Sequence, residues 1–274
     1  QKWNGFAQHV AGVVLVNTDV TVLTLLDSLK NVSVYSVYYS VVYGVEQAVM
    51  TFATGLEAMW GNMLANHEQE QLVASFSATE WIVHNGVSFV FILTGILIVP
   101  FVRVYTNGIA DTNYTLPLFG MILTAAYAAE CLRVPYFRMI KAAGHYKQTQ
   151  TASIIEMLIN VVLSVALVKR FGLNGVAVGT LAAMLYHTCY FVWYLRTKIL
   201  NRPIRFFCKY LAIDVFYALL CACLTRGFVL QELSYLAWVV LALKVGAVCL
   251  AVLIAVNCIF YRNTIRKFMQ RRKK

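Results

Sequence analysis

Residues 81–103 read WIVHNGVSFVFILTGILIVPFVR, and the only charged residue in this stretch is the last one. A run of about 20 predominantly apolar residues is long enough to cross a bilayer as an α-helix. Comparable uncharged runs occur at 112–129, 175–195 and 236–260, the last of which contains only Lys244. This pattern predicts a chain that crosses a membrane many times.

The composition supports the same conclusion. Of the 274 residues, 60% are hydrophobic and 13% are charged, whereas soluble domains have roughly 45–50% apolar and about 25% charged residues. A soluble enzyme and a secreted disulfide scaffold are therefore excluded. The seven cysteines form no CxxC pair and lie in or beside apolar runs, so we expect them to be packing residues.

The apolar runs predict an all-α integral membrane protein with about eight transmembrane helices. The expected helices are 10–29, 32–65, 81–104, 115–140, 149–169, 175–198, 206–226 and 235–261. The sequence Asn-Arg-Pro at 201–203 is the most marked break between them. It divides the chain into a six-helix lobe, 1–200, and a further helix pair with a basic tail, 201–274.

Lys and Arg are distributed unequally between alternate loops. With eight spans, 17 of the 23 basic residues fall on the side of both termini and five on the other side. Cytoplasmic loops carry the excess of Lys and Arg in membrane proteins. We therefore expect both termini in the cytoplasm, and we read the net charge of +11 as a topology signal rather than as a nucleic-acid site.

Polar residues at bilayer depth are candidates for a transport cavity. An ionisable residue at a helix centre costs about 2.5–3.5 kcal/mol, so it should face protein or a hydrated cavity. In 149–169, Thr149, Ser153, Glu156, Asn160 and Ser164 fall on one helix face. With polar residues of the first two expected helices, the candidate cavity residues are Asn17, Asp19, Glu46, Glu156 and Asn160. The alternative is that these stripes only bond neighbouring helices together.

A basic cluster follows the fourth expected helix, on the predicted cytoplasmic side. It consists of Arg133, Arg138, Lys141 and Lys147. Such a cluster suits the phosphate or pyrophosphate of a lipid-linked substrate, although it could also serve only to enforce topology. Within the same segment, Pro135 predicts a kink or a helix boundary.

Small residues form a ridge on the expected helix 175–198. Gly175, Gly179 and Ala183 are spaced by four residues, which predicts a close approach of another helix backbone. His187 continues this ridge, and we expect it to be a hydrogen-bonded packing residue.

Asp214 and Lys244 are the ionisable residues of the last two expected helices. Counted from the predicted cytoplasmic ends, their depths differ by roughly 15 Å at about 1.5 Å per residue. We therefore expect no ion pair between them.

Enzyme signatures are lacking. The sequence contains no GxxxxGK[ST] phosphate loop, HExxH, GxSxG or CxxC motif, and the expected outer loops are too short for a catalytic platform. We expect a transporter that uses neither cofactor nor metal, and not an enzyme.

Several segments resemble bacterial polysaccharide exporters of the Wzx flippase type. They are YTNGIADTNY at 105–114, LKNVSVYSVY at 29–38, AGHYKQTQ at 143–150, KRFG at 169–172 and GVAVGT at 175–180. The similarity runs from about Asn17 to Leu200. It implies the multidrug/oligosaccharidyl-lipid/polysaccharide exporter superfamily, in which two six-helix lobes enclose a central cavity. Eight helices are expected here where the family has twelve or fourteen, so the chain would be the second lobe with a trailing helix pair.

What the resemblance implies is movement of undecaprenyl-diphosphate-linked oligosaccharide repeat units across the bacterial inner membrane, as in O-antigen and lipopolysaccharide biosynthesis. The implied partners are the lipid bilayer, that lipid-linked oligosaccharide and a missing N-terminal lobe, with no nucleic acid. The chain begins with Gln1 rather than Met, which fits a piece of a longer protein. Three alternatives remain: a drug or metabolite exporter of the same superfamily, a membrane-embedded polysaccharide polymerase, and an inactive remnant.

Overall fold

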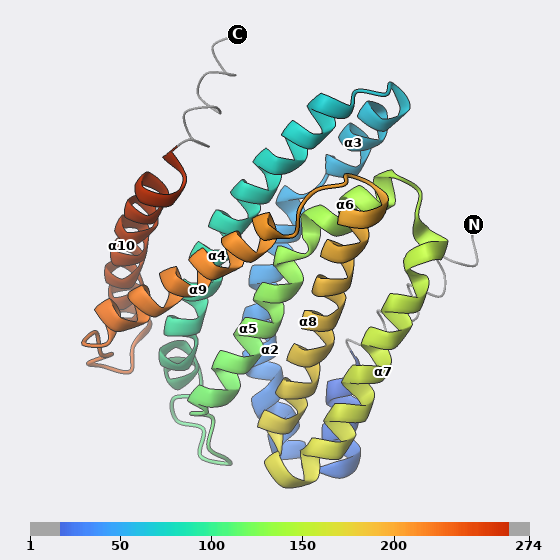
Figure 1. Cartoon of the computed structure of the whole chain (residues 1–274). Coiled ribbons are helices and arrows are strands. Elements are labelled where there is room, and N and C mark those ends of the chain that lie inside the picture. Colours follow the sequence, from blue (N-terminus) through green and yellow to red (C-terminus); the bar gives the residue numbers. More distant parts are fainter. Residues whose placement is uncertain (1–16, 263–274) are drawn as a thin grey trace.

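The computed structural model describes residues 17–262, and every regular element in this range is a helix (Figure 1). Residues 17–26 are helical. The helices that follow are α2 (Leu29–Phe52), α3 (Leu56–Ala65), α4 (Gln69–Tyr105), α5 (Pro117–Leu132), α6 (Val134–Ala142), α7 (Tyr146–Phe171), α8 (Leu173–Lys198), α9 (Arg205–Thr225) and α10 (Tyr235–Phe260). The predicted all-α class is confirmed.

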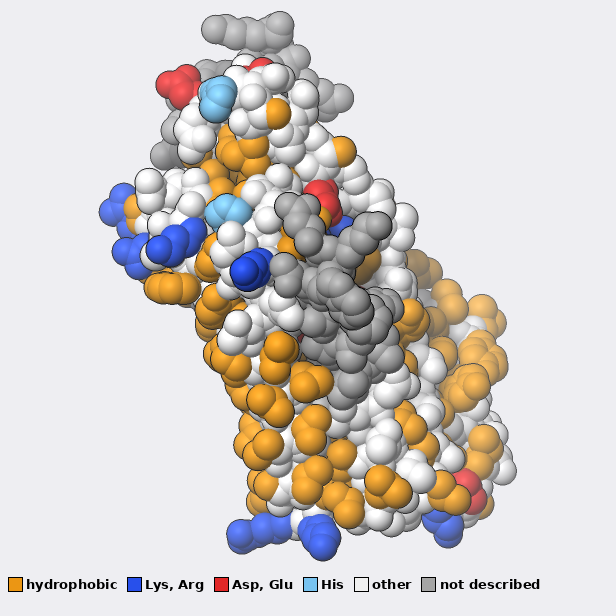
Figure 2. All heavy atoms as spheres, turned by 90° about the vertical axis from the view of Figure 1, so that its right-hand side faces the viewer, with side chains coloured by type: hydrophobic (Ala, Val, Ile, Leu, Met, Phe, Trp, Pro, Cys, Tyr) orange, Lys and Arg blue, Asp and Glu red, His pale blue; other side chains and the backbone are white. Residues whose placement is uncertain are grey.

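Between residues 17 and 262, six segments are long and apolar enough to cross a bilayer: α4, α5 with α6, α7, α8, α9 and α10. Figure 2 shows hydrophobic side chains gathered in a band, with Lys and Arg below it and at its upper edge. Two more spans were expected from the sequence. Of these, α2 has 24 residues but is not among the six, and residues 10–16 of the first expected helix lie outside the described range.

The expected helix 32–65 is wrong, because the structure contains two helices there. α2 ends at Phe52, and Gly55 adopts a left-handed backbone with φ of 88° before α3 begins. This conformation is open to glycine at no steric cost, so Gly55 allows the chain to turn. α3 then packs against α6 at one end of the bundle, called the α6 end below (Figure 1).

Residues 69–80 also differ from expectation, because they form the first turns of α4 instead of a loop. With 37 residues, α4 is about 55 Å long at 1.5 Å per residue, which exceeds the roughly 30 Å of a hydrocarbon core. Its extension is held by α3: the Trp60 ring packs 5.7 Å from Phe76, and Trp60 Nε1 donates to Ser75 Oγ at 3.1 Å. Aromatic packing thus stabilises a polar helix end beyond the apolar band.

The expected helix 115–140 is divided at Arg133 into α5 and α6. Pro135 lies in the first turn of α6, where the N–H that proline lacks would have no helical partner anyway. The predicted boundary at Pro135 is therefore confirmed. The division matters for the site because it places Arg133 between two helices, inside the bundle.

The glycine ridge of α8 lies directly against the backbone of α7. A Cβ at Gly175 would lie 2.6 Å from the carbonyl oxygen of Leu167, and one at Gly179 would lie 2.9 Å from the amide nitrogen of Ser164. Both of these atoms belong to the backbone of α7. The prediction that small residues let another backbone approach is confirmed.

The last two helices pack on the long helix α4. Apolar residues of α4, α9 and α10 form one core cluster, Trp238 Nε1 donates to the carbonyl of Leu97 at 3.3 Å, and Trp81 Nε1 donates to Asn257 Oδ1 at 3.2 Å. The break predicted at 201–203 separates α8 from α9, whereas the division into units 1–200 and 201–274 stays a prediction.

Replacing Gly175 by Ala should destabilise the protein, because the added Cβ meets a backbone carbonyl that cannot rotate away. Overpacking of this kind costs about 1–3 kcal/mol. Thermal unfolding of the purified protein in detergent measures the effect. Gly246→Ala in α10 is the matched control, since a Cβ there meets nothing within 4 Å; equal midpoints for the two variants would contradict the packing described.

Candidate transport site

Arg133, at the break between α5 and α6, is enclosed by acidic side chains. Arg133 is only 9% exposed. Its two terminal nitrogens donate to separate carboxylates: Nη2 to Glu130 Oε1 at 2.8 Å and Nη1 to Glu156 Oε1 at 2.7 Å. The planar fork of a guanidinium allows this double pairing. Since Glu156 belongs to α7, the arginine joins the α5–α6 break to α7.

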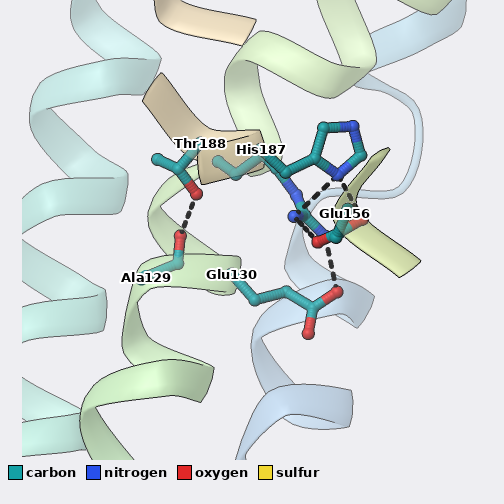
Figure 3. A network of polar contacts seen from close by, with 6 residues as sticks. Ala129, Glu130, Glu156, His187 and Thr188 are labelled. Atoms are coloured by element: carbon teal, nitrogen blue, oxygen red, sulfur yellow. Dashed lines mark hydrogen bonds and ion pairs between the residues drawn. The ribbon is translucent and has the colours of Figure 1, made fainter. Parts of the chain in front are cut away.

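His187 of α8 contacts the same pair. Its Nδ1 lies beside Glu156 Oε2 and 3.0 Å from Arg133 Nη1. The tautomer and protonation of the ring decide which contact is a hydrogen bond, because the guanidinium can only donate. In the next residue of α8, Thr188 Oγ1 donates to the carbonyl of Ala129 at 2.9 Å (Figure 3). α8 is thus tied to both α5 and α7.

Glu46 of α2 adds a third acidic group. It is 8% exposed and lies close enough to Glu130 and Arg133 to interact electrostatically with both. We call Glu46, Glu130, Arg133, Glu156 and His187 the Arg133 cluster. It places three carboxyl groups around one guanidinium at the centre of four packed helices.

A second buried group lies one turn further along α7. The carboxylate of Asp19 accepts hydrogen bonds from Tyr35 Oη at 2.9 Å, Thr180 Oγ1 at 2.8 Å and Asn160 Nδ2 at 3.3 Å. These residues come from helix 17–26, α2, α7 and α8, and Asp19 is only 2% exposed. Three donors compensate much of the desolvation of a buried carboxylate. We call this group the Asp19 cluster.

The structure therefore brings four of the five candidate cavity residues together in two groups. Asp19 and Asn160 share one cluster, Glu46 and Glu156 share the other, and Asn17 is exposed. Within residues 17–262, these buried side chains contact one another rather than one of the open cavities described below. Their role in lining a passage stays a prediction.

An exposed polar face runs along the first described helix and α2. It consists of Asn17, Thr21, Thr24, Ser36, Ser40, Tyr43 and Gln47, all of which are exposed. By contrast, the exposed residues in the middle of α7 are apolar, among them Leu158 and Val162. Exposed apolar residues are typical of a helix that faces lipid, whereas exposed polar residues can occur on a helix that borders water or another protein. We call this surface the polar face.

An apolar groove of about 720 Å³ adjoins the polar face. It lies between α2, α4 and α10 and is lined mainly by Val, Leu, Ile and Phe side chains. Ser36 and Ser40 belong both to this groove and to the polar face. Its lining suits a hydrocarbon chain, because few polar groups are available to hold a sugar.

The four basic residues predicted to contact phosphate occupy different environments. Arg133 is held by its carboxylates, Arg138 and Lys141 line an open cavity of about 530 Å³ beside the α2–α3 joint, and Lys147 is exposed. Of these four residues, Arg138 and Lys141 are the two that line the same cavity. The common role of all four stays a prediction.

Sequence reasoning missed a further set of buried charges around α4. Glu80 is fully buried, pairs with Arg202 and accepts a hydrogen bond from Tyr136 Oη. One turn on, His84 Nδ1 lies 2.5 Å from Asp214 Oδ2. The sequence did indicate this set, because Glu80 and His84 are four residues apart and therefore share one helix face where the apolar run of α4 begins.

Asp214 pairs with His84 rather than with Lys244, which is exposed on α10. This agrees with the expectation that Asp214 and Lys244 lie at different depths. The seven cysteines are free thiols. Across residues 17–262, no three His, Cys, Asp or Glu side chains gather in a way that could hold a metal ion.

The comparisons with known proteins identify the fold. No family model matches the chain, and no curated protein matches it either. Among solved structures, it is similar to the lipid II flippase MurJ in its inward closed conformation, with a TM-score of 0.68 and 19% sequence identity. The match covers 95% of this chain and 53% of that one, so the chain spans about half the length of MurJ and shares the fold of that half.

Replacing Arg133 by Gln should strongly destabilise the protein, because it leaves Glu130 and Glu156 buried without their cation. Breaking a buried pair in this way costs about 3–5 kcal/mol. The free energy of unfolding in mixed micelles measures the loss. Arg196→Gln, which removes an exposed arginine from α8, should change it by less than about 0.5 kcal/mol; similar losses in both variants would show that the cluster contributes no special stability.

Proposed function

We propose that this chain is the second half of a transporter that moves lipid-linked oligosaccharides, such as undecaprenyl-diphosphate-linked repeat units, across the bacterial inner membrane. The observation that carries the proposal is the shared fold with one half of a lipid II flippase. The sequence resemblance to polysaccharide exporters supports it independently. On this proposal the α6 end faces the cytoplasm.

The proposed substrate combines an apolar tail with a strongly polar head. A bare diphosphate or sugar in hydrocarbon would leave its polar groups without hydrogen bonds, at a cost of several kcal/mol each. The polar face would carry the head through a hydrated passage, while the apolar groove would hold part of the tail. The two surfaces meet at Ser36 and Ser40, which allows one molecule to use both.

The passage would require a second lobe. We propose that the missing N-terminal half of the protein covers the polar face, because an exposed side-chain amide such as that of Gln47 is unfavourable against lipid. Alternating access in such transporters is largely a rigid-body movement of one half against the other. In this scheme the Arg133 and Asp19 clusters keep the lobe rigid, since each links helices that must move together.

The test is complementation of bacterial cells that lack their own flippase for a lipid-linked oligosaccharide, using the full-length gene. We expect export to be restored, and Gln47→Leu to reduce it severalfold because it places an apolar side chain in the polar face. Gln148→Leu is the matched control, because Gln148 is equally exposed but lies at the start of α7, away from that face. It should export normally.

Other outcomes would redirect the proposal. Failure to restore export, together with acquired resistance to small toxic compounds, would favour the drug or metabolite exporter. Lengthening of the oligosaccharide in place of its export would favour a polymerase. Equal export by the Gln47→Leu and Gln148→Leu variants would remove the polar face from the passage.

A further inference from the structure

The cavity beside the α2–α3 joint is built from two segments that are far apart in the sequence. The joint contributes Ala53, Thr54 and Gly55, and α3 contributes Glu57 and Ala58; α6 contributes Arg138, Lys141 and Ala142. Its volume of about 530 Å³ falls within the roughly 300–1,000 Å³ of small-molecule sites. Arg138 and Lys141 are three residues apart, so they share one face of α6.

The cations of this cavity retain unused hydrogen-bonding capacity. Arg138 Nη1 lies 3.6 Å from Glu57 Oε2, which is too long for a hydrogen bond. Arg138 Nε is shielded from solvent and has no hydrogen-bond partner among the described residues. The Lys141 ammonium lies 4.3 Å from the centre of the Phe137 ring. Arg138 Nη1, which makes no hydrogen bond to Glu57 at 3.6 Å, can therefore donate to an anion that enters the cavity.

The opposite wall adds to the positive potential. No side chain caps the N-terminus of α3, and its first residues line the cavity. The first N–H groups of a helix have no partner within the helix and favour anions. Glu57 opposes this effect, but it also accepts a hydrogen bond from Tyr146 Oη at 3.1 Å, which holds its carboxylate to one side.

The position of the cavity indicates the kind of anion. Arg138 and Lys141 lie in the last turns of the apolar segment Pro117–Ala142, where lipid headgroups meet water. A phosphate group offers several oxygens to a guanidinium, an ammonium and backbone amides together. We propose that this cavity binds the phosphate of a lipid headgroup.

The source of that phosphate is either an anionic membrane phospholipid or the diphosphate of a polyprenyl-linked substrate. Only the second source rests on the proposed function. Binding and export are therefore measured separately. A loss of binding then tests the phosphate site, and a loss of export tests the proposed function.

The experiment is a lipid titration of the delipidated protein in detergent, followed by native mass spectrometry. The probes are phosphatidylglycerol, farnesyl diphosphate and diacylglycerol, the last having no phosphate. We expect both phosphate-bearing probes to bind, and the Arg138→Gln/Lys141→Gln double variant to bind them about tenfold more weakly, because two charge-assisted contacts are lost. Glu57→Gln should bind them more tightly, since it removes the competing carboxylate.

Lys198→Gln is the matched charge control. Lys198 is exposed at the end of α8, outside the residues that line the cavity, and its loss should change affinity by less than about twofold. Farnesyl diphosphate binding tenfold tighter than phosphatidylglycerol would identify the substrate as the source; similar affinities would identify membrane phospholipid.

Three results would overturn the proposal: equal weakening by Lys198→Gln, undiminished binding by the double variant, or equally tight binding of diacylglycerol. Arg138→Lys keeps the charge but replaces the planar guanidinium fork with a single ammonium, so it should weaken binding less than the double variant. It serves in place of the double variant if that protein unfolds, and unchanged binding by Arg138→Lys with no gain in Glu57→Gln would also reject the site.

Discussion

The pairing of Arg133 with Glu130 and Glu156 is the interaction on which the rest of the structure depends. A charged group inside an apolar bundle is tolerated only when it is paired and hydrogen-bonded. Here the cation comes from a helix break, and its carboxylates come from α5 and α7. His187 on α8 contacts the same group. Four segments are thereby fixed in one arrangement, and removing the arginine or one of its carboxylates leaves a buried charge without its partner.

The two buried clusters and the exposed surfaces have different roles in this structure. The Arg133 and Asp19 clusters join helices through hydrogen bonds and ion pairs, which suits a rigid unit. The polar face and the apolar groove are exposed, and they meet along α2. On the proposed function, a polar surface left open on this half is what a two-lobed passage would require.

Much of the fold could be predicted from the sequence. Uncharged runs located the apolar spans, and Pro135 located the division between α5 and α6. The joint at Gly55 was missed because the residues on both sides of it are apolar, so the hydrophobic pattern continues through the turn. The start of α4 was missed for the opposite reason: residues 69–80 are polar enough to read as a loop, and contacts such as the packing of Phe76 on Trp60 and Tyr136 stabilise them as a helix.

The site was predicted less completely, for a physical reason. Spacing along α7 placed Glu156 and Asn160 on one face, and both are buried. Which residues they would meet depends on the relative rotation and depth of separate helices, and no local pattern records these. Arg133 was therefore expected to face a lipid phosphate, although the structure surrounds it with carboxylates, and His84 was overlooked as the partner of Asp214.

A double-mutant cycle between Arg133 and Glu156 tests the central role of this pairing most directly. The free energy of unfolding is measured for the wild type, Arg133→Gln, Glu156→Gln and the double variant. We expect the double variant to lose less free energy of unfolding than the two single variants lose together, with a coupling energy of about 1–3 kcal/mol for residues in direct contact. If the two single losses add up to that of the double variant within about 0.5 kcal/mol, the central role of this pairing is contradicted.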